Sequence, residues 1–278
     1  MKEGTNIKRR KFLTALSVLT LIAVLVRCAL YSGLTIKKYT ISSDKITQSH
    51  IFAVISDLHC TYYGENQEDL IAKIDQYAPE AIFLTGDIAE DVRPIDGCDA
   101  LMNHIADRYP CYYVTGNHER WSAAADDMKA VFQAYGAVVL DGTSIDAVFG
   151  EDTIRIHGVS DPLYYSSYAA FESAVSALEV SDNLFDILLS HRPECAELYA
   201  ACGFDLTLNG HAHGGQVRIP FIMNGLYAPN QGWFPKLAGG HYEFGETDII
   251  VSRGLMIDDI PRIFNPPELV IITLTPTD

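Results

Sequence analysis

The stretch IFAVISDLH, residues 51–59, joins a continuous apolar run to an aspartate and a histidine. Unbroken apolar character over residues 51–56 is typical of a strand that is buried on both faces. Asp57 and His59 follow where such a strand would end. Alone, an aspartate after a strand is more commonly a turn former or a helix cap, and a single histidine is more commonly a surface or core residue. The interpretation therefore depends on how the other strands end.

Four further predicted strands end in the same small set of residue types. They cover residues 81–86, 111–116, 185–190 and 204–210. The carboxyl ends of strands are where ligands bind in open α/β sheets. Together the five strand ends supply seven candidate metal ligands, and His118 stands beside one of them. The seven ligands are Asp57, His59, Asp87, Asn117, His191, His211 and His213.

The rest of the chain indicates an α/β fold. Helical periodicity covers residues 67–78, 97–108, 122–136 and 168–179. Further strands are predicted at 137–140, 146–150, 153–160, 248–254 and 268–275. Strands that alternate with helices early in the chain and accumulate late predict a mixed sheet system.

The seven candidates predict two metal ions. Carboxylates and imidazoles that converge in one pocket are electrostatically costly unless a cation neutralises them. One divalent ion takes about four protein ligands or fewer. Asp87 is the best bridging ligand because it comes alone from its strand. Imidazole, carboxylate and amide ligands without a thiolate suit Mn, Fe or Zn better than Ca or Cu(I).

The motifs DLH, GD, GNHE, SH and GHAH, in that order, resemble those of the calcineurin-like metallophosphoesterase family. The resemblance runs from about residue 50 to the C-terminus. GHAHGGQVRIPF, with SRGL and NPPELVI, is similar to the bacterial, membrane-associated branch. The resemblance implies a two-sheet β-sandwich flanked by helices, with a dimetal site at the C-termini of the strands.

The resemblance also implies roles. Asp57, His59, Asp87 and His213 would bind the first metal, and Asp87, Asn117, His191 and His211 the second. A hydroxide that bridges the metals would attack phosphorus in line. His118 would not be a ligand but would donate a proton to the leaving oxygen or steady the transition state.

Two assignments stay open. The family's second motif often reads GD-x-x-D, whereas this chain has GDIAED, so either Glu90 or Asp91 could orient His118. Arg120 and Arg192 each follow a candidate site residue and could contact substrate phosphate. The alternative is that both arginines pair with the abundant acidic residues.

Charge argues against a large nucleic-acid partner. Residues 41–278 hold 12 Lys and Arg against 35 Asp and Glu, a formal net charge of −23. Bound metals would still allow a small phosphate-bearing substrate. The six cysteines form no CxxC pair and are interpreted as mostly buried thiols.

The N-terminal sequence indicates a segment that directs the chain to a membrane. A basic flank precedes the charge-free run Phe12–Val26, and Arg27 then interrupts the run. We favour an uncleaved anchor with the domain on the extracytoplasmic side. The alternatives to an uncleaved anchor are a cleaved export signal and a buried helix of a cytosolic protein. We therefore expect three parts in the chain. Residues 1–31 form the cytoplasmic basic flank with the membrane anchor or export signal, residues 32–48 a linker, and residues 49–278 the metallophosphoesterase domain.

The function predicted from the sequence is a dimetal phosphodiesterase acting on a phospholipid, lipid-linked or cell-envelope phosphate ester. A phosphomonoesterase and a non-catalytic metal-binding scaffold on the same fold are the alternatives. A metal-dependent amide or peptide hydrolase is less favoured because no HExxH motif is present. Nothing in the sequence indicates an oligomeric state.

Overall fold

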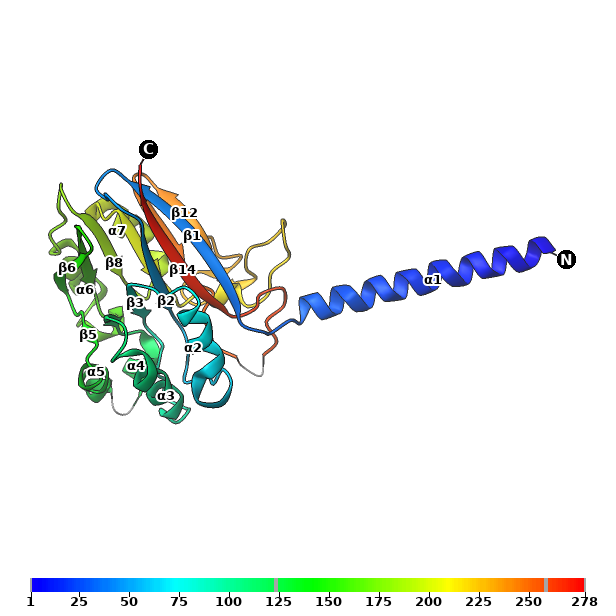
Figure 1. Ribbon diagram of the computed structural model, residues 1–278, viewed down its shortest axis with the longest axis horizontal. Helices are drawn as coiled ribbons and strands as arrows, with labels where there is room; N and C mark the ends of the chain where they lie inside the picture. The colour runs from blue at the N-terminus through cyan, green and yellow to red at the C-terminus, as the bar shows by residue number, and fades with distance from the viewer. Residues whose placement is uncertain (1, 123–124, 258–259, 278) are drawn as a thin grey trace.

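The structure is a computed structural model that describes residues 2–122, 125–257 and 260–277. Two six-stranded sheets form a sandwich with helices on its outer faces (Figure 1). The helices are α1 (Lys2–Ala29), α2 (Glu68–Asp75), α3 (Asp96–Ile105), α4 (Asn117–Trp121), α5 (Ala125–Ala134), α6 (Tyr168–Ser176) and α7 (Ala196–Cys202).

The first sheet has the strand order β1-β14-β2-β3-β4-β5. Strands β2 to β5 run parallel to one another, and β14 pairs antiparallel with β2. The carboxyl ends of β2, β3 and β4 therefore lie at one edge. The strands are β1 (Thr35–Ser43), β2 (His50–Ile55), β3 (Ala81–Thr85), β4 (Cys111–Val114), β5 (Val138–Val139) and β14 (Glu268–Pro276).

The second sheet has the order β12-β13-β9-β8-β7-β6. Its inner strands β7, β8, β9 and β13 are parallel. A small hairpin of β10 (Tyr227–Ala228) and β11 (Gly232–Trp233) lies between the two halves of this sheet in the chain. The strands are β6 (Thr143–Phe149), β7 (Asp152–Gly158), β8 (Phe185–Leu189), β9 (Leu206–Asn209), β12 (Gly240–Phe244) and β13 (Thr247–Val251).

The core sits between the sheets and under the helices. Phe52, Phe83, Ile187 and Leu208 belong to one buried cluster that joins the facing sides of both sheets. A second cluster packs α2, α3 and α5 onto the outer face of the first sheet, and a third packs α6 and α7 onto the second. β2, β3, β4, β8 and β9 are buried on both faces, or nearly so, which is why they are continuous apolar runs in the sequence.

The predicted sandwich with flanking helices is confirmed, and each predicted strand overlaps an observed one. The expected linker at residues 32–48 is different in the structure, because residues 35–43 form β1 and pair with β14 along their whole length. Residues 123–124 of the predicted helix 122–136 lie outside the described residues, and α5 follows them. The sequence patterns did not predict α7 or β12.

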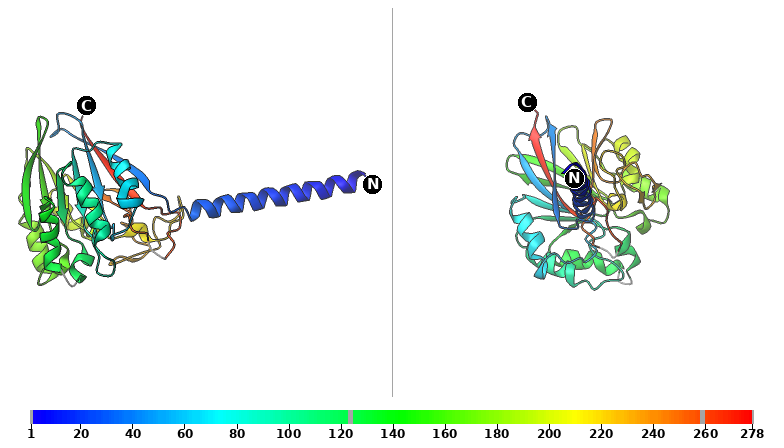
Figure 2. Two further views of the ribbon diagram at one scale, coloured as in Figure 1. Left: turned by 60° about the horizontal axis from the view of Figure 1, so that its bottom comes forward. Right: turned by 90° about the vertical axis from the view of Figure 1, so that its right-hand side faces the viewer.

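Helix α1 extends away from the domain (Figures 1 and 2). Residues 10–29 contain an 18-residue window with a mean hydropathy of 2.2, and none of this window is buried inside the structure. By length and composition α1 could cross a membrane. A helix buried in the domain, one of the sequence-based alternatives, is wrong.

Candidate metal centre

Five loops bring the candidate ligands to the carboxyl ends of the strands. Asp57 and His59 follow β2, and Asp87 follows β3. Asn117 opens α4 after β4, while the remaining histidines follow β8 and β9 of the second sheet. Backbone hydrogen bonds from Asp57 N to Gly86 O and from His59 N to Asp87 O, both 3.0 Å, fasten the first two loops together.

The ligand atoms converge in two groups that share Asp87. Its Oδ2 lies 3.0 Å from His191 Nε2 and 3.7 Å from His59 Nε2. His213 Nε2 lies 3.6 Å from Asp57 Oδ1. Within each group the ligand atoms lie within 4.8 Å of one another; one group is Asp57, His59, Asp87 and His213, and the other is Asp87, His191 and His211.

The chemistry of these atoms fits divalent metals. Asp87 Oδ2, His59 Nε2, His191 Nε2 and Asn117 Oδ1 are buried, and no hydrogen bond of good geometry satisfies them, although His191 Nε2 and Asp87 Oδ2 form an ion pair at 3.0 Å. Buried polar groups in proteins are nearly always satisfied, so four unsatisfied atoms around one carboxylate require an explanation. Cations between them would satisfy all four. Asp87 is the member common to both groups, as expected for a bridging ligand.

The backbone is strained at these positions. Five of the seven candidates have a positive φ of 47–66°, a region that residues other than glycine seldom adopt. Such strain persists only where the surrounding structure enforces it, and it clusters at functional sites. The five are Asp57, His59, Asp87, His211 and His213.

Glycines allow the loops to approach one another. A Cβ on Gly116 would lie 2.2 Å from Asp87 Oδ1. A Cβ on Gly254, which has a φ of 73°, would lie 2.7 Å from the Cβ of Asp57. Side chains at either position would displace a candidate ligand.

Burial keeps the two histidines of GHAH neutral. It lowers the pKa of His211 to about 2 and that of His213 to about 4. Burial would also lower the pKa of His191, but the adjacent Asp87 carboxylate outweighs it and raises that pKa to about 10. The neutral imidazoles of His211 and His213 have a lone pair to offer a metal, and a metal bound at His191 would displace the proton of that ring.

The structure separates Glu90 from Asp91. Asp91 Oδ1 lies 3.0 Å from Nδ1 of His118, whereas Glu90 Oε2 lies 3.4 Å from Nδ1 of His59. Each acid therefore contacts a different imidazole. The ring of His118 packs edge-on against His59, with centroids 4.5 Å apart, and against Trp121. His118 is less buried than the candidate ligands and lines both clefts of the site.

Glu119 organises the site, although the sequence analysis did not single it out. Its buried carboxylate accepts hydrogen bonds of 2.7–3.1 Å from the N–H groups of Asp87, Ile88, Ala89 and Gly116. Burial raises the pKa of Glu119 to about 7. The motif GNHE contains this glutamate, and its place in the capping position N3 of α4 was the available indication.

The two candidate arginines have different surroundings. Arg192 is buried, and its guanidinium binds Asp161. Its Nη1 also lies 2.9 Å from Nε2 of His211 and 2.7 Å from Oδ1 of Asn230. Arg120 is exposed, and its guanidinium lies 5.7 Å from the centre of the Tyr164 ring.

Two small clefts open onto the candidate ligands. One of about 210 Å³ is lined by His59, His118, His213, Gln216, Met256, Ile260 and Arg262. The other, of about 230 Å³, is lined by Asp87, Asn117, His118, Trp121, Leu163, Arg192, His211, His213, Pro229 and Asn230. These clefts are the accessible part of the site.

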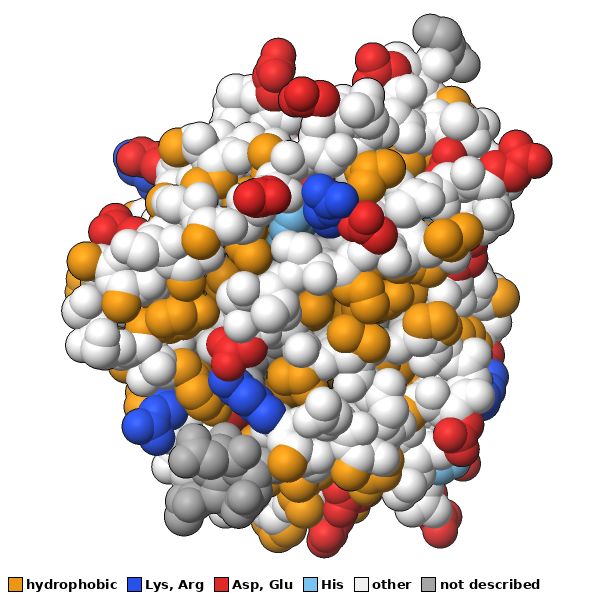
Figure 3. Space-filling model, turned by 90° about the vertical axis from the view of Figure 1, so that its left-hand side faces the viewer, with side chains coloured by type: hydrophobic (Ala, Val, Ile, Leu, Met, Phe, Trp, Pro, Cys, Tyr) orange, Lys and Arg blue, Asp and Glu red, His pale blue; other side chains and the backbone are white. Residues whose placement is uncertain are grey.

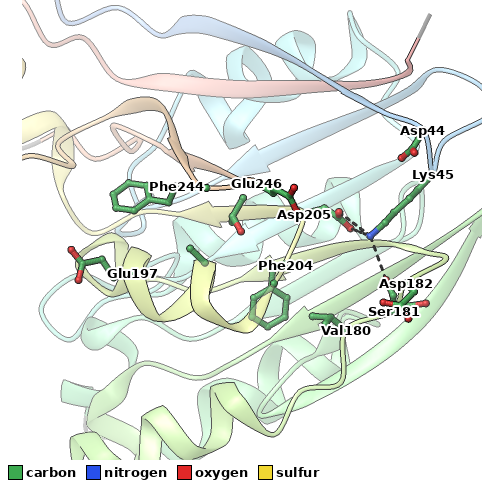
Figure 4. A pocket seen from close by; sticks show the side chains of 14 residues that line it. Asp44, Lys45, Val180, Ser181, Asp182, Glu197, Phe204, Asp205, Phe244 and Glu246 are labelled. Carbon is green, nitrogen blue, oxygen red and sulfur yellow. Dashed lines mark hydrogen bonds and ion pairs between the residues drawn. The ribbon is translucent and has the colours of Figure 1, made fainter.

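A larger cavity of about 940 Å³ lies elsewhere, at the amino-terminal ends of β8 and β9 (Figure 4). Acidic side chains surround it, and Lys45 pairs with Asp205 at 2.8 Å. None of the candidate ligands lines it. The volume of a cavity therefore does not locate the site in this protein.

Comparisons with known proteins agree with this geometry. The chain is 29% identical over 230 residues to YkuE of Bacillus subtilis (strain 168), an uncharacterized metallophosphoesterase, covering 80% of this chain and 78% of YkuE. It is 25% identical over 207 residues to the phosphodiesterase YaeI of Escherichia coli (strain K12). That alignment covers 72% of this chain and 73% of YaeI. TT1561 of Thermus thermophilus shares the fold, with a TM-score of 0.51 and 14% identity over 75% of this chain and 91% of that one. The model of the calcineurin-like phosphoesterase family matches residues 50–215. The chain therefore belongs to the calcineurin-like phosphoesterase family, a family of metal-dependent phosphoester hydrolases.

Proposed function

We propose that this protein is a dimetal phosphodiesterase that acts on a phosphate ester at a membrane surface. The convergence of unsatisfied buried ligand atoms around Asp87 is the observation that carries the metal assignment. Asp57, His59, Asp87 and His213 would hold one ion. Asp87, Asn117, His191 and His211 would hold the other, and Mn, Fe or Zn suits these ligands.

When bound, such ions neutralise charge on the phosphoryl oxygens and lower the pKa of the attacking water. The protein's own contribution is to hold the ligands and to move a proton. In the imidazolium form of His118, Nδ1–H donates to Asp91, and Nε2–H would give its proton to the leaving oxygen, which returns the ring to its neutral form. His118 is then the catalytic acid and Asp91 its positioning residue.

Asn230 positions His211 in this scheme. Nε2 of His211 lies 3.0 Å from Oδ1 of Asn230, which can only accept, so Nε2 carries the ring proton and donates it to that oxygen. This tautomer leaves the lone pair of Nδ1 free to bind a metal. Nη1 of Arg192 donates to the same oxygen of Asn230 and holds it in place. Asp161 fixes the guanidinium of Arg192 from the other side.

The charge of the clefts favours a diester over a monoester. A phosphate monoester carries one more negative charge than a diester and needs an additional cation. Two arginines line the clefts, and both already have partners within the protein. Arg192 binds Asp161, and Arg262 donates to the carbonyls of Asn265 and Met256. The likeness to YaeI, which is named a phosphodiesterase, supports the same preference.

The test uses the full chain in detergent, loaded with Mn²⁺, on bis(p-nitrophenyl) phosphate and p-nitrophenyl phosphate. We expect faster hydrolysis of the diester. Asp87→Asn, the matched control, should lose both hydrolysis and bound metal. Faster monoester hydrolysis would favour the phosphomonoesterase alternative. Bound metal without hydrolysis of either ester would favour the non-catalytic scaffold.

A further inference from the structure

Large apolar side chains protrude from the segment between β9 and β12. Phe221 is 109% exposed relative to its reference state, Ile222 81%, and Trp233 and Phe234 each 68%. Ile260, on a neighbouring loop, is also exposed. We call these five side chains the apolar rim. Single exposed apolar residues are ordinary, but several in one region mark an interaction surface.

The backbone holds the two phenylalanines outward. Phe221 has a φ of 68° and Phe234 a φ of 57°, so both stand in the left-handed region that bulky residues avoid. Phe221 lies in a tight turn closed by hydrogen bonds between Ile219 and Met223 of 2.8 and 3.0 Å. The backbone at Phe221 is therefore held in a strained conformation that exposes the aromatic ring. Because such strain clusters at functional sites, the exposed ring indicates a function.

The apolar rim is connected to α1 through backbone hydrogen bonds. Arg218 N donates to Ile263 O at 2.9 Å, and Phe264 N donates to Ala29 O, the last residue of α1, at 2.7 Å. Five residues, 30–34, separate α1 from β1. An extended chain of that length spans at most about 17 Å. A membrane that held α1 would therefore lie close to this face of the domain.

The figures agree with that placement. The yellow-to-orange loops between β9 and β12 lie on the side from which α1 leaves, in Figure 1 and in the left view of Figure 2. Figure 3 shows the opposite side, where acidic and basic side chains are interspersed with apolar ones.

The charge of the segment suits an anionic lipid surface. Between Leu206 and Tyr242 the sequence contains no Asp or Glu, in a chain with 36 acidic residues. Arg218 and Lys236 lie within the same segment. The strongly acidic remainder of the domain would be repelled by anionic head groups, whereas this segment would not.

The loops of the apolar rim also border the candidate metal centre. Ile260 lines the cleft that contains His59 and His213. Pro229 and Asn230, between the two parts of the rim, line the cleft that contains Asp87 and His211. A bilayer that contacted the rim would therefore lie near the mouth of the site.

From these observations we propose that the apolar rim inserts into the interface of the bilayer that holds α1, so that the metal centre acts on the phosphodiester head group of a lipid in that bilayer. The claim about substrate rests on the proposed function, whereas the claim about membrane contact does not. Trp233 fits this role because tryptophan favours the boundary between lipid and water.

The two tryptophans, Trp121 and Trp233, allow a direct test of contact. Trp121 lies on α4, which Figure 1 places away from α1, and lines the cleft beside His118 rather than the apolar rim. The full chain is reconstituted in vesicles of anionic lipids with brominated acyl chains, which quench indole fluorescence at short range. Trp121→Phe reports on Trp233 alone, and Trp233→Phe reports on Trp121 alone. We expect most of the Trp233 emission to be lost and the Trp121 emission to fall much less, because Trp121 would lie at the level of the head groups and not among the acyl chains. Unquenched Trp233, or equal quenching of both, would overturn the proposal.

A second test concerns the substrate. The double variant Phe221→Ser/Ile222→Ser is compared with Val148→Ser, which replaces another highly exposed apolar residue, on β6. Hydrolysis of a phosphodiester lipid in vesicles should fall about tenfold in the double variant, since each inserted side chain contributes through its buried apolar area. Hydrolysis of bis(p-nitrophenyl) phosphate should not fall, and Val148→Ser should match the wild type on both. An equal loss on both esters would contradict the role of the rim. If the wild type hydrolyses neither ester, the proposed function fails, while the quenching result still decides the membrane contact.

Discussion

Asp91 Oδ1 lies 3.0 Å from Nδ1 of His118, and the neighbouring Glu90 instead lies against His59. Asp91→Asn should therefore lower kcat by about 10- to 100-fold, the usual effect of losing a group that orients a catalytic residue. Metal content should not change, because His118 is not a proposed ligand. Steady-state kinetics and metal analysis on the same preparation check both expectations.

Glu90→Gln is the matched comparison. Glu90 contacts His59, a proposed ligand, and pairs with Arg93 at 3.0 Å. Its replacement should weaken metal affinity, and added Mn²⁺ should restore activity. If Glu90→Gln behaved like Asp91→Asn, with full metal content and a low kcat, the division of roles between these two acids would be wrong.

His211→Ala and His213→Ala should each empty a different metal position. The two side chains belong to different ligand groups, which share Asp87. Each variant should retain one metal per chain by elemental analysis, whereas Asp87→Asn should lose both. Loss of both metals from either histidine variant would show that the two positions do not fill independently.

Glu119→Gln should destabilise the fold. The carboxylate accepts four backbone hydrogen bonds, and an amide nitrogen in place of one oxygen would leave buried N–H groups unpaired. We expect a loss of about 3 kcal/mol in the free energy of unfolding, measured by denaturant titration. Glu172→Gln, an exposed glutamate on α6, is the control and should change stability little. Equal stability of the two variants would argue against the proposed role of Glu119.

Removal of metal should lower the thermal midpoint of unfolding. Without cations the carboxylates of Asp57 and Asp87 remain buried among imidazoles, and bound ions stabilise the native state by mass action. A chelator should lower the midpoint of the wild type by several degrees and that of Asp87→Asn much less. A midpoint that is insensitive to chelator in the wild type would argue against a resident metal.

The sequence predicts the sandwich because its central strands are buried on both faces and are therefore continuous apolar runs. The same runs locate the candidate ligands, which follow the strands directly. β1 lacks this pattern: Lys37 and Lys38 are exposed on an edge strand, so the segment resembles a linker. α7 is only seven residues long and has too few turns for a clear helical period.

The finer contacts of the site depend on tertiary structure. Glu90 and Asp91 are equivalent in the sequence, and only the path of the loop after Asp87 decides which imidazole each one meets. Arg192 could not be assigned because its partners Asp161 and Asn230 come from distant segments. The apolar residues around Trp233 could equally have been core, and only their exposure distinguishes a rim.

The central claim is that two metals held around Asp87 hydrolyse phosphodiesters. Its most direct test is to measure metal content and bis(p-nitrophenyl) phosphate hydrolysis in one titration, as Mn²⁺ is returned to the chelated full chain. The account predicts hydrolysis that rises with the second metal and reaches its maximum at two per chain, and no hydrolysis by Asp87→Asn at any Mn²⁺ concentration. Full hydrolysis at one metal per chain, or by Asp87→Asn, would contradict it.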